Sequence, residues 1–324
     1  MKKLFAIMLA LMLVLTMGSA LAEEGPDSRT SFTITKEYEE TNPDAGEVPV
    51  ETLAFTVTPV SVSDAEAGIN VADYVPTVAA SSTTGGVIDT ITVTLPTYKS
   101  IGVYTYTISE NAGNTAGVTY STDAITLEVT VVRGTDGALL TYPVVKVGDN
   151  ESKTTTITNT YSAGELQVKK EVTGNLGDTT KAFDVTVTFT KPDGKTVVGP
   201  ISYVDDGETK TVTFADGAET ATATITLMHD ETVTFTNIPY GVTYTVTEED
   251  YTKSDGYDAA EYDFSDSNKK IDTTDADTVK ITNNKGTQID TGITTDNLPY
   301  IVLMGIVVLA GVAMIAKRRM AHND

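Results

Sequence analysis

The sequence predicts an all-β protein made of two tandem immunoglobulin-like β-sandwich domains, preceded by a signal peptide and followed by a transmembrane helix. Three observations support this: short runs in which Thr, Val, Tyr and Ile alternate, clusters of Gly, Asp and Asn between those runs, and an internal repeat. Alternation with a period of two is typical of strands with one buried face. Turn clusters such as Asp136-Gly137 and Asp216-Gly217 therefore separate antiparallel strands.

The N-terminal end, 1–22, has the layout of a secretory signal peptide. Lys2 and Lys3 precede an apolar run, and Ala20 and Ala22 form a small-residue cleavage site. The alternative is an N-terminal membrane anchor, but the apolar run is short for a span. We expect cleavage after Ala22 and export of the remainder.

The C-terminal end predicts a membrane segment. Residues 298–316 are apolar and uncharged, which is about the length needed to cross a bilayer core. Lys317, Arg318 and Arg319 follow directly, and the positive-inside rule places the basic tail, 317–324, in the cytoplasm. The alternative of a buried core helix does not account for these terminal basic residues.

The composition excludes several classes of function. A net charge of −23 repels nucleic acid and keeps an exposed surface soluble. The chain has no cysteine and only two histidines, His229 and His322, so disulfides, histidine zinc sites and Ser-His-Asp triads lack their residues. The acidic stretches 255–266 and 272–277 lack the spacing of a calcium loop. We expect no metal, no cofactor and no hydrolase.

Two parts of the chain repeat the same order of motifs. The first part contains Phe-Thr-Ile-Thr-Lys at 32–36, a strand ending in Ile-Ser-Glu at 108–110, and Thr-Ile-Thr-Asn at 156–159. The second contains Leu-Gln-Val-Lys-Lys at 166–170, a strand ending in Val-Thr-Glu at 246–248, and Lys-Ile-Thr-Asn at 280–283. The boundary between the two repeats gives domains at 23–162 and 163–286.

Each repeat places three polar residues on an apolar strand face, because side chains alternate between the two faces of a strand. These residues are Lys36, Glu110 and Asn159 in the first repeat and Lys170, Glu248 and Asn283 in the second. Lys169 falls on the polar face. Singly, each has an ordinary explanation, such as a lysine that reaches solvent or an asparagine that caps a strand. Their repetition favours a shared role, because buried charges are costly unless paired or neutralised.

These three residue types together support one chemistry. Burial makes a lysine lose its proton readily and keeps a carboxylic acid protonated. The neutral amine can attack the asparagine carboxamide, while the acid polarises that group and transfers protons as ammonia leaves. The product is a Lys–Asn isopeptide bond between the first and last strands of a domain, which supplies the cross-link that cysteines do not.

With these motifs, nearly the whole chain resembles the two-domain backbone (shaft) pilins of Gram-positive bacteria, of the streptococcal pilin isopeptide-linkage type. The resemblance rests on the signal peptide, the Ile-Thr-Lys and Val-Lys-Lys starts, the Tyr-Thr-Ile-Ser-Glu and Tyr-Thr-Val-Thr-Glu-Glu-Asp-Tyr segments, the Ile-Thr-Asn ends and the C-terminal sorting region. It implies Lys36–Asn159 and Lys170–Asn283 bonds, with Glu110 and Glu248 as their catalytic residues. It also implies a structural pilus subunit whose only reaction is this single-turnover self-cross-linking.

The same resemblance implies polymerisation by a sortase, which cleaves between Thr and Gly and joins the Thr to a lysine of the next subunit. Thr291 and Gly292 match the cleavage pair, within a sorting and linker region at 287–297. Gln288 and Ile289 stand where the family has Leu and Pro, which leaves open which sortase acts.

Lys153 is the expected acceptor of the intersubunit bond, and Lys146 is the alternative. The implied partners are a sortase and identical subunits, with minor pilins and peptidoglycan as further possibilities. The implied location is the cell surface, with the precursor held at the membrane. A second hypothesis is a wall-anchored adhesin or minor pilin, which would have the same fold and bonds but would not form a ladder of covalent polymers.

Overall fold

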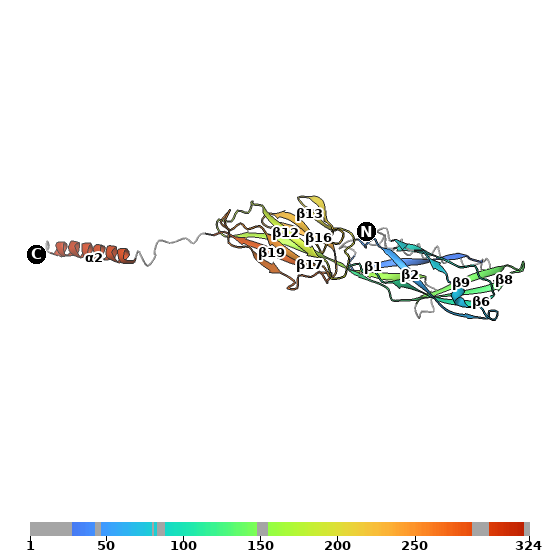
Figure 1. Cartoon of the computed structure of the whole chain (residues 1–324). Coiled ribbons are helices and arrows are strands. Elements are labelled where there is room, and N and C mark those ends of the chain that lie inside the picture. The colour runs from blue at the N-terminus through green and yellow to red at the C-terminus, as the bar shows by residue number, and fades with distance from the viewer. Residues whose placement is uncertain are drawn as a thin grey trace, which may run out of the picture.

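The computed structural model describes residues 28–42, 47–79, 81–82, 88–147, 155–286 and 298–320. Two β-sandwich domains lie end to end (Figure 1). Domain 1 extends to Tyr161, and domain 2 begins at Ala163. The predicted two-domain, predominantly β organisation is therefore confirmed, while the signal peptide lies outside the described residues.

In its described residues, domain 1 forms two facing five-stranded sheets. One has the order β3 (Thr77–Val78), β5 (Ile88–Thr94), β1 (Ser31–Glu40), β10 (Thr156–Tyr161) and β7 (Val118–Thr119). The other has the order β4 (Ser81–Ser82), β2 (Thr52–Ser63), β6 (Gly102–Asn111), β8 (Ile125–Arg133) and β9 (Leu139–Val147). A 3₁₀ turn, η1 (Val71–Asp73), follows β2 and is capped by the side chain of Asn70. Fully buried Ile34, Tyr104 and Leu127 belong to the core between the sheets.

Domain 2 packs a six-stranded sheet against a three-stranded one. The larger sheet has the order β14 (Glu208–Val212), β13 (Ile201–Asp205), β16 (Thr232–Pro239), β11 (Ala163–Thr173), β19 (Asp277–Asn284) and β18 (Glu261–Phe264). The smaller sheet has the order β15 (Thr220–Leu227), β12 (Phe183–Thr190) and β17 (Thr243–Glu248). Phe189 and Phe235, from opposite sheets, meet edge to face with ring centroids 5.3 Å apart. Such contacts place the apolar face of each strand in one core.

The first and last strands of each domain are paired side by side. β1 pairs with β10 and β11 pairs with β19, and both pairs are parallel. Both ends of a domain's chain therefore lie in the middle of one sheet. This arrangement brings residues more than a hundred positions apart in sequence onto neighbouring strands.

The junction between the domains is held by hydrogen bonds from both sides. The Ser162 N–H donates to Gly117 O at 2.9 Å, and the Tyr161 hydroxyl donates to Asn237 Oδ1 at 3.1 Å. A backbone bridge between Thr115 and Thr196 adds a contact between the two domains. These contacts hold the domains in the end-to-end arrangement.

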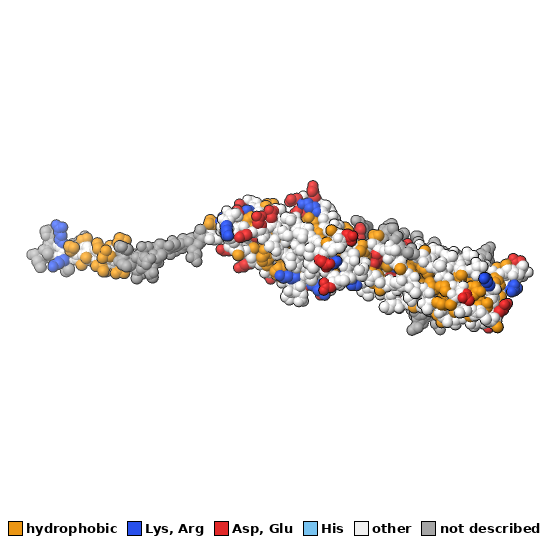
Figure 2. All heavy atoms as spheres, viewed as in Figure 1, with side chains coloured by type: hydrophobic (Ala, Val, Ile, Leu, Met, Phe, Trp, Pro, Cys, Tyr) orange, Lys and Arg blue, Asp and Glu red, His pale blue; other side chains and the backbone are white. Residues whose placement is uncertain are grey.

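The visible surface mixes both signs of charge. In Figure 2, acidic and basic side chains are interspersed over domain 2, and apolar side chains form a strip on domain 1. A continuous basic surface, which a nucleic acid would require, is not seen on that face.

The C-terminal segment forms a helix, α2 (Leu298–Met320), as expected. Among the residues that the structure describes, no helix combines the length and apolar character that crossing a membrane requires. The predicted span over 298–316 is therefore not supported by the described part of the chain. The helix also continues through Lys317 and Arg318, which the sequence assigned to a separate tail, because Lys, Arg and Met are good helix formers.

Candidate cross-linking sites

All six polar residues that parity placed on apolar faces are buried. Lys36, Asn159 and Lys170 have no exposed surface, and Asn283 is 1% exposed. The side chains of Glu110 and Glu248 are also fully buried. Lys169, by contrast, lies at an exposed position. The predicted inward orientation of these residues is therefore confirmed.

The strand register places each lysine and asparagine at the same offset. Lys36 is paired with Ile157, so Asn159 lies two residues further along the neighbouring strand and on the same face. In domain 2, Lys170 is paired with Ile281, and Asn283 again lies two residues further along. Each glutamate comes from the opposite sheet, Glu110 at the end of β6 and Glu248 at the end of β17. The two domains thus build the same site in the same way.

In domain 1, Glu110 bridges the other two residues. Its Oε2 lies 3.0 Å from Lys36 Nζ, and its Oε1 accepts a hydrogen bond of 2.7 Å from Asn159 Nδ2. Lys36 Nζ also lies 3.4 Å from the Ile157 carbonyl oxygen and 5.4 Å from the centre of the Tyr38 ring. The amine, the carboxyl group and the carboxamide therefore form one enclosed cluster.

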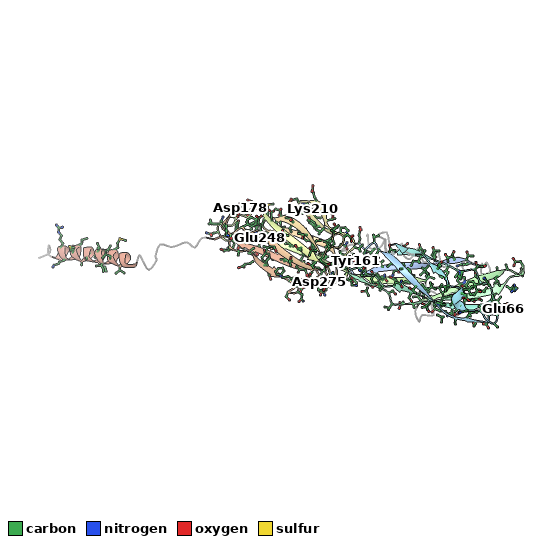
Figure 3. The ribbon with its side chains drawn as sticks, in the orientation of Figure 1. Glu66, Tyr161, Asp178, Lys210, Glu248 and Asp275 are labelled. Carbon is green, nitrogen blue, oxygen red and sulfur yellow. The ribbon has the colours of Figure 1, made fainter. Side chains whose placement is uncertain are left out.

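Domain 2 repeats this cluster. Lys170 Nζ lies 3.3 Å from Glu248 Oε1, and Asn283 Nδ2 donates to Glu248 Oε2 at 2.7 Å. Lys170 Nζ also contacts Asn283 Oδ1 and lies 4.3 Å from the centre of the Phe183 ring. Figure 3 shows Glu248 in the half of domain 2 away from the junction, which is marked by Tyr161. The amine thus touches the group that it would attack.

Burial favours the uncharged forms of Lys36, Lys170 and Glu248. Burial lowers the pKa of Lys36 and of Lys170 below the ordinary value, although the facing glutamate opposes the shift in each case. Burial raises the pKa of Glu248, against the opposing effects of Lys170 and Asn283. Loss of solvation outweighs the attraction between the partners, so the pair in domain 2 favours a neutral amine and a protonated acid.

Two contacts around these sites were not foreseen from the sequence. The Ser121 N–H donates to Asn159 Oδ1 at 2.8 Å, and His229 Nδ1 accepts the Val172 N–H at 3.0 Å. Ser121 lies in a loop, where alternation gives no orientation. The one sequence signal for His229 is that it is the single histidine between the two end segments.

Several predicted residues lie elsewhere. Thr291, Gly292 and Lys153 fall outside the described residues. Lys146 is exposed on β9, opposite Thr126 of β8. The structure therefore describes the internal cross-linking sites but not the sorting region.

Comparisons with known proteins agree with the two-domain division of the sites. Residues 22–162 match the family model described as the Spy0128-like isopeptide containing domain. Residues 164–285 match a domain of unknown function, DUF7601. A pilin of Streptococcus pyogenes serotype M1 is 29% identical over 244 residues, which cover 69% of this chain and 70% of that protein.

Solved structures show a shared fold. The crystal structure of the major pilin from Streptococcus pyogenes has a TM-score of 0.55 and 21% identity, covering 82% of this chain and 100% of that chain. The major pilin protein T3.2 from Streptococcus pyogenes serotype GAS13637 has a TM-score of 0.56 and 23% identity, covering 81% of this chain and 100% of that chain. The chain is thus similar in sequence to a pilin of Streptococcus pyogenes and shares the fold of the major pilins, and its first domain matches the Spy0128-like isopeptide containing domain.

Proposed function

We propose that this chain is a structural subunit of a sortase-assembled surface pilus, and that each of its domains, 23–162 and 163–286, forms an internal Lys–Asn isopeptide bond. The observation that carries this proposal is the duplicated site, in which a buried lysine, glutamate and asparagine recur at the same register offset. The similarity to pilins over most of the chain supports the structural role.

The bond would form by acyl transfer within one domain. The lone pair of Lys170 Nζ attacks Cγ of Asn283, and the carbonyl electron pair moves onto Oδ1. Glu248 gives its proton to Nδ2, which leaves as ammonia, and recovers a proton from Nζ. An amide replaces an amide, so neither oxidant nor cofactor is needed. The contact between Nζ and the carboxamide brings the nucleophile to the electrophile. Glu248 lies 3.3 Å from Nζ and 2.7 Å from Nδ2, which are distances that suit the two proton transfers.

The bonds would suit a fibre that carries load. Each one joins the first and last strands of its domain, which are already neighbours. Force applied to the C-terminal end of domain 2 would pass from Asn283 to Lys170 without unravelling the strands between them. Without the bond, the load would fall on the hydrogen bonds between these two parallel strands.

For assembly, we propose that a sortase cleaves between Thr291 and Gly292, within 287–297, and transfers the Thr to a lysine of the next subunit. Lys153 is the proposed acceptor, and Lys146, which is exposed, is the alternative. Replacing Lys153 or Lys146 by Arg, one at a time, in cells that make the pilus distinguishes the two candidate acceptors. Only the acceptor's loss should abolish the ladder of detergent-resistant polymers. A single band in unaltered cells would instead favour an adhesin or minor pilin.

Intact mass measurement of the purified ectodomain tests the cross-linking. We expect a mass that is two ammonia molecules below that of the sequence. Lys170→Ala should restore one of them, whereas Lys169→Ala, at an exposed neighbouring position, should restore none. A mass equal to that of the sequence would refute the internal bonds.

A further inference from the structure

We propose that the backbone N–H of Ser121 is the oxyanion donor of the domain 1 cross-link, an inference that rests on the proposed function. The observation behind it is the hydrogen bond of 2.8 Å from the Ser121 N–H to Asn159 Oδ1. This oxygen is the atom on which negative charge develops when Lys36 attacks. A fixed donor aimed at such an atom stabilises the transition state without reorganisation.

The hydrogen bonds fix the orientation of the Asn159 carboxamide. A backbone N–H can only donate, so the atom facing Ser121 must be the oxygen. The nitrogen, Nδ2, is then the atom that faces Glu110 Oε1 at 2.7 Å. The electrophile is therefore held from both ends. The end that gains charge meets a donor, and the end that leaves meets the acid.

Two anchors hold Ser121 in place. β7 pairs with β10, with Thr119 opposite Thr160, so the chain reaches Ser121 directly beside Asn159. The preceding residue, Tyr120, donates its hydroxyl to Glu51 Oε2 at 2.6 Å.

The second anchor extends into the site. Glu51 also accepts hydrogen bonds from the hydroxyls of Thr115 and Tyr38, and the Tyr38 ring lies beside Lys36. The carboxylate of Glu51 thus ties the loop that carries Ser121 to the strand that carries the nucleophile. We regard Glu51 as a positioning residue for the donor.

The atoms balance with Ser121 in this role. Lys36 Nζ forms a bond to Cγ of Asn159, and the carbonyl electron pair moves to Oδ1, where the Ser121 N–H holds it. Collapse of this intermediate restores the carbonyl and expels Nδ2, which takes a proton from Glu110 and leaves as ammonia. Glu110 regains a proton from Nζ. Ser121 exchanges no proton, and its hydrogen bond persists to the carbonyl oxygen of the new amide.

Domain 2 holds the matching oxygen differently. Asn283 Oδ1 contacts Lys170 Nζ, the nucleophile itself. Loss of the Ser121 N–H should therefore slow one bond and leave the other unchanged. The second domain of the same molecule becomes an internal reference for folding, ammonia release and measurement.

The sharpest test replaces one backbone atom in the full chain. Ser121→Ala keeps the backbone N–H. Lactic acid at 121, introduced during cell-free synthesis, has the same methyl side chain as alanine but an ester oxygen in place of the backbone N–H. Samples quenched at intervals are analysed by intact mass and peptide mapping. We expect domain 1 to cross-link about 100-fold more slowly with the ester than with alanine. Domain 2 should cross-link at the same rate in both.

Equal domain 1 rates, or equal slowing of both domains, would overturn the role of Ser121. Protease resistance compared between ester and alanine forms in a Glu110→Gln background checks the fold without the bond. Loss of domain 1 resistance in the ester form there would assign the slowing to misfolding and also overturn the role. An unaltered chain that releases no ammonia would instead refute the proposed function.

Discussion

Replacement of Glu248 by Gln separates the cross-link from the charge of its site. Gln can still accept the hydrogen bond that Asn283 Nδ2 gives to Glu248, but it has no acidic proton to transfer. It also adds no unpaired charge beside Lys170, whose pKa burial already lowers. We therefore expect a folded domain 2 without its isopeptide bond. The chain should gain the mass of one ammonia.

The stability lost with the bond can be calculated from the length of the loop that the bond closes. Lys170 and Asn283 are 113 positions apart in sequence. Chain entropy assigns a cross-link of about that length roughly 5 kcal/mol at 25 °C. For a domain of about this size, such a loss lowers Tm by roughly 20 °C.

The assay combines intact mass with calorimetry of the full ectodomain. Glu249→Gln, at the exposed neighbouring position, is the matched control and should keep both bonds and the Tm of domain 2. Domain 1, with its own bond, provides the second transition. If Glu248→Gln still released two ammonia molecules, its assigned role would be wrong. If the bond were lost with no change in Tm, the entropic reasoning would fail.

Three further outcomes follow from the same geometry. Glu110→Gln should remove only the domain 1 bond. The double variant Glu110→Gln/Glu248→Gln should keep both ammonia masses, and calorimetry should show that the two substitutions lower the two unfolding transitions independently. Asn283→Ala cannot form the domain 2 bond and leaves Glu248 free to titrate. Its free energy of unfolding, measured in urea, should fall as pH rises from 4.5, the ordinary pKa of Glu, through the raised pKa of Glu248. In that range only the folded state keeps the proton of Glu248. The lowered pKa of Lys170 acts in the opposite direction, so stability should recover as pH rises from that pKa towards 10.5. In thermal unfolding, Gly117→Ala should destabilise the chain by about 1–3 kcal/mol more than Gly137→Ala. Both glycines have a positive φ, but of the two only Gly117 would place a Cβ 2.5 Å from a backbone oxygen, that of Ser162. Equal costs at the two glycines would contradict the close approach at the junction.

Strand alternation carried most of what could be predicted about the sites. Lys36 and Lys170 were assigned to the core only by their parity with neighbouring apolar residues, and both are fully buried. Parity works here because each strand has one face in the core and one in solvent. It also separated Lys170 from the exposed Lys169.

The same reasoning could not reach contacts made from outside the strands. The Ser121 N–H approaches Asn159 from a loop, and Glu51 lies just before β2, far from both in sequence. A backbone donor has no side-chain signature at all. The C-terminal helix is a separate case. Apolar composition predicted a span over 298–316, and no helix among the described residues has the length and apolar character for one.

Before reaction, the stability of each domain must come from core residues other than the lysine, glutamate and asparagine of its site. A buried lysine facing a buried glutamate contributes little net stability, because desolvation offsets their attraction. In domain 2, Leu166, Phe235 and Ile281 of the surrounding core are fully buried. The fold can therefore form first and hold the three groups together. The proposed bond formation would then convert the amine into an amide and remove an ionisable group from the core. Because the departing ammonia would be lost to solvent, a site that adds little to stability before reaction would become a permanent link afterwards.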